Sequence, residues 1–237
     1  MTKPLFTTIL LLGGIAALSV SPSLAASKTY DRAAFTGVDI GSSLDARIEI
    51  GPIQSIRAET ADQVNLDKLH VEVVNGRLRA FMERSVWDLV SFSDPHVAIT
   101  IVTPSLDALS ASAAAEVIAS GMTGSKLTVE VSSSADIKVA HIDTQSIAIS
   151  ASSAGTLDLD GACVSGTVQI SSGASISGAA LECVDLNIEA SSGASGVLFA
   201  SGQVNAQVSS GANIQLAGHP DHVDDEVSSG ADVDVLR

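Results

Sequence analysis

The sequence predicts an all-β protein, namely a single-stranded parallel β-helix (a β-solenoid) with about nineteen to twenty residues per coil. Three observations predict this fold: a small-residue corner that recurs at a nearly constant spacing, alternating apolar and polar residues around each corner, and an aromatic content of only 3%. Alternation with a period of two is typical of β-strands, and a fixed period near twenty residues is typical of stacked coils. Scarce aromatics indicate a narrow core of small and β-branched side chains.

The recurring corner resembles Ser-Ser-Gly-Ala, with Ser or Ala in place of Gly in the first three copies. Seven copies end on an alanine at a spacing of eighteen to twenty positions: Ala115, Ala135, Ala154, Ala174, Ala194, Ala212 and Ala231. Because the third position varies, we expect small volume, rather than glycine's access to positive φ, to be the shared requirement. The terminal Ala is expected to point into a cramped corner. The Ser column is interpreted as structural, and an ice- or glycan-binding face is the alternative.

Short strands are expected on both sides of each corner. Val129 and Val131 precede one corner and Ile137 and Val139 follow it, as in a strand with one buried face. The third corner departs from this phase by one residue, and Gly155 beside it predicts a local bulge. A looser third side of each coil is expected around Gly121, Gly161, Gly178 and Gly218.

Residues 26–102 lack this corner and are interpreted as irregular first coils with an end cap. Asn75-Gly76 lies between two alternating apolar runs, which is a strong signal for a β-hairpin. An antiparallel element of this kind would cover one open end of the stack. The segment 84–94 is expected to be a loop or a short helix. Residues 103–237 are expected to form the regular coils, and 30–237 one continuous domain.

Residues 1–25 are expected to be a signal peptide. Lys3 provides a positive start, an apolar run follows from Leu5 to Val20, and small residues precede a cleavage site after Ala25 or, alternatively, Ala26. The apolar run is short for a membrane span and is interrupted by glycine. The mature chain is therefore expected to be exported to the periplasm, the outer surface or the medium.

Acidic residues dominate the chain, with 27 Asp+Glu against 12 Lys+Arg and a net charge of −15. The imbalance is strongest between residues 101 and 236, where Lys126 and Lys138 are the only cations beside sixteen acidic residues. Nucleic acids and anionic membranes require clustered cations, so neither is expected as a direct partner. Hydrophobic residues still make up 46% of the chain, which predicts a packed core rather than disorder.

Cys163 and Cys183 are the most specific candidate pair. They are separated by about one coil period, and each follows a corner Ala by nine positions, so we expect them side by side in adjacent coils. That placement suits a disulfide, and export exposes the pair to oxidising conditions. A disulfide is predicted, with two buried free thiols as the alternative.

The sequence offers no coherent catalytic or cofactor-binding motif. Serine is abundant, but there is no Gly-x-Ser-x-Gly nucleophile elbow and no Ser–His–Asp arrangement that the sequence can place. The stretch from His219 to Glu226 is rich in His and carboxylates and is considered as a weak divalent-cation site, although a solvated acidic loop is the preferred interpretation. We therefore expect no enzyme, no cofactor and no metal.

Several motifs together resemble one known family. They are Phe35-Thr36-Gly37-Val38, the run Val73 to Leu78, the run Val97 to Pro104 followed by Leu106, the Ser-Ser-Gly-Ala-Asp corner, and Gly218-His219-Pro220. This order of motifs is similar to the head GIN domain family (putative autotransporter adhesin, formerly a domain of unknown function), over nearly all of residues 30–237. The resemblance implies a β-helical, extracytoplasmic, adhesin-like protein, and it transfers no catalytic residues. The first three corners depart from the family's usual glycine.

These observations favour a non-catalytic, exported binding or structural module of the cell envelope, with a glycan or protein ligand. An alternative is a self-assembling envelope scaffold, because the final coil would expose a sheet edge that another copy could extend into a homo-oligomer. Asp232 and Asp234 carry the competing interpretation, as charges that guard this edge. A polysaccharide-active β-helix enzyme is the third hypothesis.

Overall fold

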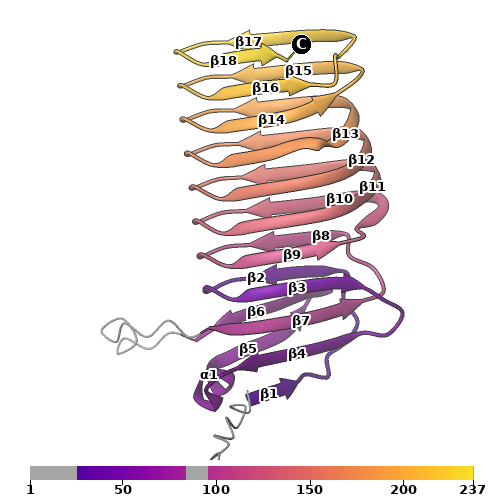
Figure 1. Ribbon diagram of the computed structural model, residues 1–237, viewed down its shortest axis with the longest axis vertical. Coiled ribbons are helices and arrows are strands. Elements are labelled where there is room, and N and C mark those ends of the chain that lie inside the picture. Colours follow the sequence, from indigo (N-terminus) through magenta and orange to yellow (C-terminus); the bar gives the residue numbers. More distant parts are fainter. Residues whose placement is uncertain (1–25, 84–95, 237) are drawn as a thin grey trace, which may run out of the picture.

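The computed structural model describes residues 26–83 and 96–236 (Figure 1). The expected signal peptide, residues 1–25, and the segment 84–94, expected as a loop or short helix, lie outside the described residues. Strands dominate the described parts, and no helix in them is long and apolar enough to cross a membrane.

The regular part of the molecule is a stack of coils whose lowest coil contains β2 (Gly37–Ile40) and β3 (Asp45–Ile50). Its later strands are β8 (Ala108–Ala111), β9 (Glu116–Ser120), β10 (Thr123–Val131), β11 (Asp136–Ala151), β12 (Thr156–Ile170), β13 (Ser175–Ala190), β14 (Ser195–Ala200), β15 (Gln203–Val208), β16 (Asn213–Ala217), β17 (His222–Val227) and β18 (Asp232–Val235). All of these strands pair in parallel with the strands of neighbouring coils. The predicted parallel β-solenoid is confirmed.

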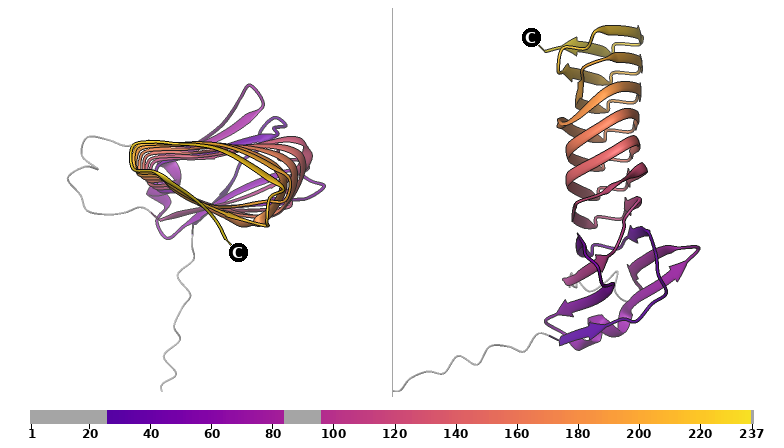
Figure 2. Two further views of the ribbon diagram at one scale, coloured as in Figure 1. Left: turned by 90° about the horizontal axis from the view of Figure 1, so that it is seen from above. Right: turned by 90° about the vertical axis from the view of Figure 1, so that its right-hand side faces the viewer.

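The pairing register defines the length of each coil. Successive partners along one outward column recur at intervals of eighteen to twenty positions and are Ala108, Thr128, Ala148, Thr167, Asn187, Asn205 and Asp224. Each coil contributes one β segment to each of two facing sheets, joined by a tight corner on one side and a wider bend on the other (Figure 2). In β11, β12 and β13 the two segments belong to one strand that continues around the wide bend. Residues that alternate with this column point inward, where they stack on like residues above and below.

Each corner is a tight turn in which both central residues have positive φ. In the corner from Ser191 to Ala194, Ser192 has φ +57° and Gly193 has φ +69°, and the Ala194 amide donates to the Ser191 carbonyl at 3.2 Å. The same pair of positive φ values recurs in every corner between residues 112 and 231. Two successive left-handed residues define a type I′ turn. The expectation that small volume alone governs the corner is therefore wrong, because Ser and Ala also adopt the left-handed conformation there.

Hydrogen bonds along the stack offset the strain of these turns. The amide of the second central residue donates to a carbonyl in the next coil, as from Ser134 to Ser153 and from Gly193 to Ser210, both at 3.0 Å. A left-handed non-glycine residue costs about 1–2 kcal/mol. This cost is tolerated because the left-handed turn directs the amide at a carbonyl of the coil above, and without this hydrogen bond the amide would lack a partner.

The third corner begins one residue later than the sequence pattern suggested. Ser153 and Ala154 are its left-handed residues, and the Gly155 amide donates to the Ser152 carbonyl at 3.0 Å. Gly155 therefore occupies the buried position where the other corners place Ala, while Ala154 is exposed at the turn. The assignment of Ala154 to the inward column is corrected by this shift.

No bulge interrupts the strand that follows Gly155. Thr156 to Leu159 pair continuously with Asp136 to Val139. The register shifts instead on the wide side of the coils, between Val139 and Ile142 and again between Asp158 and Asp160. The predicted bulge at Gly155 is wrong, because its premise was the misplaced third corner.

A further corner lies in the N-terminal part, where none was expected. Ser42 and Ser43 have φ +61° and +56°, and the Ser43 amide donates to the Ala113 carbonyl at 2.9 Å. Leu44 is fully buried in the place of the corner Ala. The expectation that residues 26–102 lack the corner is wrong, because Leu44 disguises the small-residue motif.

The lower end of the stack is covered by a small cap (Figures 1 and 2). Its elements are β1 (Ala26–Thr29), β4 (Ser55–Thr60), α1 (Gln63–Lys68), β5 (Leu69–Val74), β6 (Arg77–Met82) and β7 (Val97–Thr103). Antiparallel pairing joins β1 to β4, β4 to β7, and β5 to β6. The hairpin at Asn75-Gly76 is confirmed, with φ of +52° and +75° at the two turn residues. The short helix α1 was not predicted; Asp62 caps it by accepting from the Val64 amide.

The core is one continuous apolar layer between the two sheets, from Tyr30 in the cap to Leu216 near the upper end. Val, Ile, Leu and Ala fill it. Among the described aromatic side chains, Tyr30 and Phe35 are buried, and both belong to the cap region. The coils themselves are thus too thin for aromatic layers, as the composition indicated.

Candidate functional site

A concave groove runs along the stack beside the corners. Its outer wall is a column of polar side chains held in register on successive strands: Ser150, Gln169, Glu189, Gln207 and Glu226. Its other wall is formed by the first corner residues Ser171, Ser191, Ser209 and Ser228. We call this feature the corner groove; it has a volume of about 830 Å³.

The groove arises from the alternation of the strands. Between each wall pair lies one residue, such as Ile170 or Ala190, whose side chain points into the core. The outer surface at that position therefore consists of backbone and is lower than the side chains on either side. Because every coil repeats this pattern, the depressions join into one continuous channel parallel to the long axis.

The polar side chains of this surface form ladders between coils. The Gln169 side-chain amide donates to Glu189 Oε2 at 3.2 Å, and the Asn205 amide donates to Asn187 Oδ1 at 3.1 Å on the adjacent column. Each amide keeps further donors and acceptors exposed. The surface thus repeats hydroxyl, amide and carboxylate groups at the spacing between coils, about 4.8 Å.

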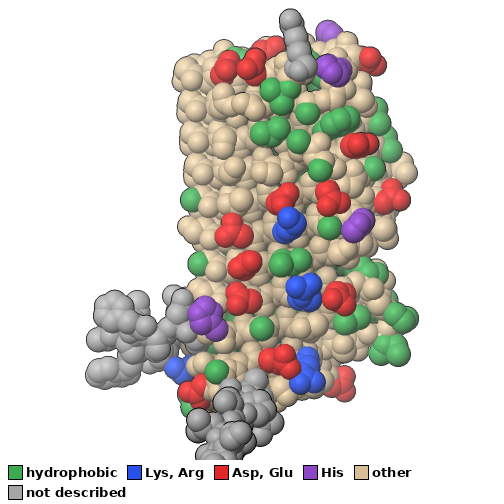
Figure 3. All heavy atoms as spheres, in the orientation of Figure 1, with side chains coloured by type: hydrophobic (Ala, Val, Ile, Leu, Met, Phe, Trp, Pro, Cys, Tyr) green, Lys and Arg blue, Asp and Glu red, His purple; other side chains and the backbone are tan. Residues whose placement is uncertain are grey.

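The electrostatic character of the groove is neutral to acidic. Glu189 and Glu226 are its charged side chains, and from residue 139 to 236 the sequence contains no Lys or Arg. Figure 3 shows the opposite face of the stack, formed by β9, β16 and β18, where charged side chains gather away from the almost entirely tan corner edge at the left. The corner groove can therefore form hydrogen bonds with a neutral polar chain, and it repels a polyanion.

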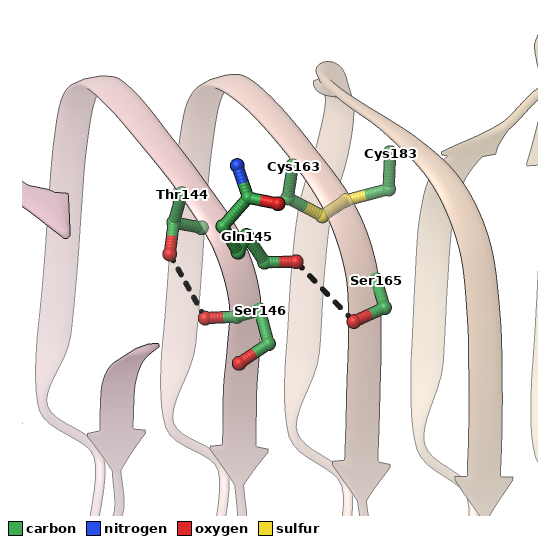
Figure 4. Close-up of a disulfide and its surroundings, with 6 residues drawn as sticks. All are labelled: Thr144, Gln145, Ser146, Cys163, Ser165 and Cys183. Carbon is green, nitrogen blue, oxygen red and sulfur yellow. Dashed lines mark hydrogen bonds between the residues drawn. A yellow bond between two sulfur atoms is a disulfide. The ribbon is translucent and has the colours of Figure 1, made fainter. Parts of the chain in front are cut away.

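Cys163 and Cys183 are direct partners on β12 and β13, with their Cα atoms 4.4 Å apart (Figure 4). The structure joins them as a disulfide, and both are buried, at 5% and 2% exposed. Thr144 occupies the same inward column one coil below, and its hydroxyl donates to the Ser146 carbonyl at 3.0 Å. The bridge therefore ties two adjacent coils on their wide side, away from the corner groove.

The structure also brings together Ser120, His141 and Asp160 from three successive coils, which sequence reasoning did not identify. Ser120 Oγ lies 3.2 Å from His141 Nδ1, and Asp160 Oδ1 accepts the backbone amide of His141 at 2.8 Å. The carboxylate thus binds the backbone rather than the imidazole, so the three do not form a Ser–His–Asp relay. Asp160 instead supports His141 in its left-handed conformation, φ +59°. The signal available in the sequence was that each of these three residues follows the previous one by about one coil period.

A partly buried ion pair joins the cap to the first coils, and it also escaped the sequence analysis. Arg77 on β6 contacts Asp39 on β2 with Nη2 2.5 Å from Oδ1, and Ser110 on β8 donates to the same oxygen at 2.5 Å. Burial acts to raise the pKa of the Asp39 carboxyl, but the hydrogen bonds from Arg77 and Ser110 outweigh it, so this pKa lies below its ordinary value. The hydrogen bond to Asp39 in turn raises the pKa of Arg77.

The His219–Glu226 stretch spans a bend and strand β17, with His219 and His222 exposed. Within residues 26–83 and 96–236, no cluster of three or more His, Cys, Asp or Glu side chains is arranged to hold a metal ion. The six other corner alanines lie in one column, buried from Ala115 to Ala212 and partly buried at Ala231. Their role is to close the core.

Comparisons with solved structures support the fold. A putative adhesin from Bacteroides fragilis superposes with a TM-score of 0.80 at 15% identity, covering 90% of this chain and 97% of that one. A putative lipid binding protein from Parabacteroides distasonis superposes with a TM-score of 0.72 at 13% identity, covering 90% of this chain and 97% of that one. A putative adhesin from Parabacteroides merdae superposes with a TM-score of 0.67 at 16% identity, covering 90% of this chain and 96% of that one. At these identities the likeness concerns the fold alone.

A search of curated protein sequences finds no match to this chain. The family model described as "Putative auto-transporter adhesin, head GIN domain" matches residues 34–220, from just before β2 to the bend before β17. This range contains all of the stacked corners except the last, the hairpin, and the corner groove over most of its length. The protein therefore belongs to the head GIN domain family of putative auto-transporter adhesins.

Proposed function

We propose that this protein is an exported, non-catalytic, adhesin-like module that binds an elongated neutral polar polymer, such as a neutral glycan chain, along the corner groove. The observation that carries the proposal is the register of the groove wall, in which Gln169, Glu189 and Gln207 stack on successive coils. A linear ligand lying parallel to the stack would meet the same groups at each coil. Many weak contacts of this kind add up through multivalency.

The chemistry of the wall supports this ligand class. Hydroxyl and amide groups pair well with sugar hydroxyls, whereas the acidic surface disfavours anionic polymers. The groove contains no aromatic side chain among its lining residues, so each contact is expected to be weak and length-dependent. The adhesin description of the family and the expected signal peptide support a location at or beyond the cell envelope.

The test is a binding screen of the mature chain against neutral and acidic polysaccharides of graded length. Affinity is expected to rise with the length of neutral chains and to be weak for acidic ones. A groove variant, Gln169→Ala with Glu189→Ala and Gln207→Ala, is expected to bind about tenfold more weakly, since three hydrogen-bonding groups are lost. The chain length of the bound polymer is expected to stay unchanged on incubation, in accordance with a non-catalytic role.

A matched control removes one carboxylate and two other polar groups from surfaces outside the groove: Asp143→Ala, Ser177→Ala and Gln215→Ala. These three residues lie outside the groove lining. The proposal is contradicted if the groove variant binds as tightly as this control, or if no neutral polymer binds the wild-type protein. Release of shortened chains would contradict the non-catalytic assignment.

A further inference from the structure

The upper end of the stack is formed by β17 and β18. Within the described residues, β17 pairs with β15 and β18 with β16, and neither has a strand on its other side. Edges of this kind carry unpaired amides and carbonyls and are templates for pairing with another chain. Exposed apolar side chains also favour association with another chain, since Val227, Val235 and Leu236 are 40–42% exposed at this end.

Four outward residues of this last coil differ from those of the coil below in the same way. The register pairs Asn205 with Asp224, Gln207 with Glu226, Asn213 with Asp232, and Gln215 with Asp234. In all four columns a neutral amide is replaced by a carboxylate. The first three replacements preserve the size and shape of the side chain, so packing does not explain them.

A fifth carboxylate lies at a position that is part of the core in the coils below. Asp225 is the register partner of Ala206, which is 2% exposed and stacks on Ile188 of the preceding coil. At the open end Asp225 is exposed to solvent. A strand added above β17 would bury this carboxylate between apolar layers, which is strongly unfavourable for an unpaired charge.

Within residues 26–83 and 96–236, no Lys or Arg of the upper coils offsets these five carboxylates, and Arg237 lies outside the described residues. From Val139 through Leu236 the chain has no Lys or Arg, and His222 is the one titratable base on β17. Two such ends brought edge to edge would place like charges about one strand spacing apart. Inward-pointing and edge-lining charges are devices by which natural sheets prevent edge-to-edge pairing.

We propose that Asp224, Asp225, Glu226, Asp232 and Asp234 form a charged end coil that blocks the addition of a further strand and keeps the protein from associating through its upper end. This assignment favours edge protection over the self-assembling scaffold that an exposed edge suggests. It is independent of the proposed glycan binding, because the end coil can protect the edge whether or not the groove binds a polymer.

The test compares the wild-type chain with an end-coil variant that carries the residues of the coil below: Asp224→Asn, Asp225→Ala, Glu226→Gln, Asp232→Asn and Asp234→Gln. Sedimentation over a wide concentration range is expected to show monomeric wild type and a variant whose average mass at least doubles. Asp225→Ala alone, the smallest change, is expected to associate measurably at the highest concentrations. Circular dichroism melting checks that each variant is folded.

A matched control neutralises five exposed carboxylates on lower coils: Glu116→Gln, Glu130→Gln, Asp136→Asn, Asp143→Asn and Glu182→Gln. It changes the net charge by the same amount and is expected to stay monomeric. The proposal is overturned if the wild-type protein itself associates through this end, if both end-coil variants remain monomeric, or if the control associates equally.

Discussion

Replacing Gly193 with Ala separates the two physical explanations of the corner, small volume and left-handed backbone. Gly193 has φ +69°, and a Cβ built on it would meet no atom within 4 Å. Volume therefore cannot oppose the substitution. If volume were the only constraint, Ala would stabilise the protein by about 0.4–1 kcal/mol, because it restricts the unfolded chain.

The observed turn predicts the opposite sign. Left-handed Ala costs about 1–2 kcal/mol relative to its preferred conformations. Restriction of the unfolded chain by Ala offsets part of this cost, so we expect Gly193→Ala to lower the free energy of unfolding by about 1 kcal/mol. Gly193→Asn is expected to cost less, since Asn tolerates this conformation better than Ala.

The assay is urea denaturation followed by circular dichroism, with the midpoint and slope reported for each variant. Gly124→Ala is the matched control, because Gly124 lacks a positive φ and its added Cβ would make an ordinary contact of 3.5 Å with Leu127. This control is expected to be neutral or slightly stabilising. The reasoning is refuted if Gly193→Ala stabilises the protein or behaves like Gly124→Ala.

Three further outcomes follow from the structure. Replacing Cys163 and Cys183 with Ser is expected to lower the free energy of unfolding by about 3 kcal/mol. The intact mass of the native protein should be lower than that of the reduced protein by two hydrogen atoms. A mass that does not change on reduction would contradict the disulfide. Asp39→Asn is expected to cost about 1–2 kcal/mol. Because the folded pKa of Asp39 is depressed below 3.8, this difference should persist above that pH and disappear as the pH falls through the folded pKa; a difference that survives in strong acid would refute the role of the carboxylate. Gly161→Ala would drive a Cβ into the Ile142 carbonyl oxygen and is expected to cost about 3 kcal/mol or more, as measured by thermal melting; a variant as stable as the wild type would contradict the packing described here.

The features that the sequence predicted correctly depend on local or strictly periodic signals. Asn75-Gly76 predicted the hairpin because two left-handed residues are needed within a two-residue loop. Alternation around each corner predicted the strands because every second side chain faces the same side of a sheet. The period near twenty residues predicted the stack because each coil can bury its apolar face only against its neighbours.

The features that escaped prediction depend on contacts between coils. Leu44 concealed the first corner, because its left-handed Ser pair is recognisable only from the hydrogen bond to Ala113. Ala154 was assigned to the inward column, which Gly155 occupies, because a one-residue shift can be read only from pairing with the coil below. The corner groove and the Asp39–Arg77 pair likewise join residues that are about one coil or more apart in the chain.

The sequence by itself therefore determined the β-solenoid, the coil length and the expectation that Cys163 and Cys183 lie in adjacent coils. These follow from periodicity, which any regular stack of the chain must respect. The tertiary structure alone decided which corner residues are left-handed, where the groove lies, and that carboxylates gather on the last coil in place of amides. The physical reason is that register between parallel strands is set by hydrogen bonds between coils, and each side chain acquires its neighbours only once that register is formed.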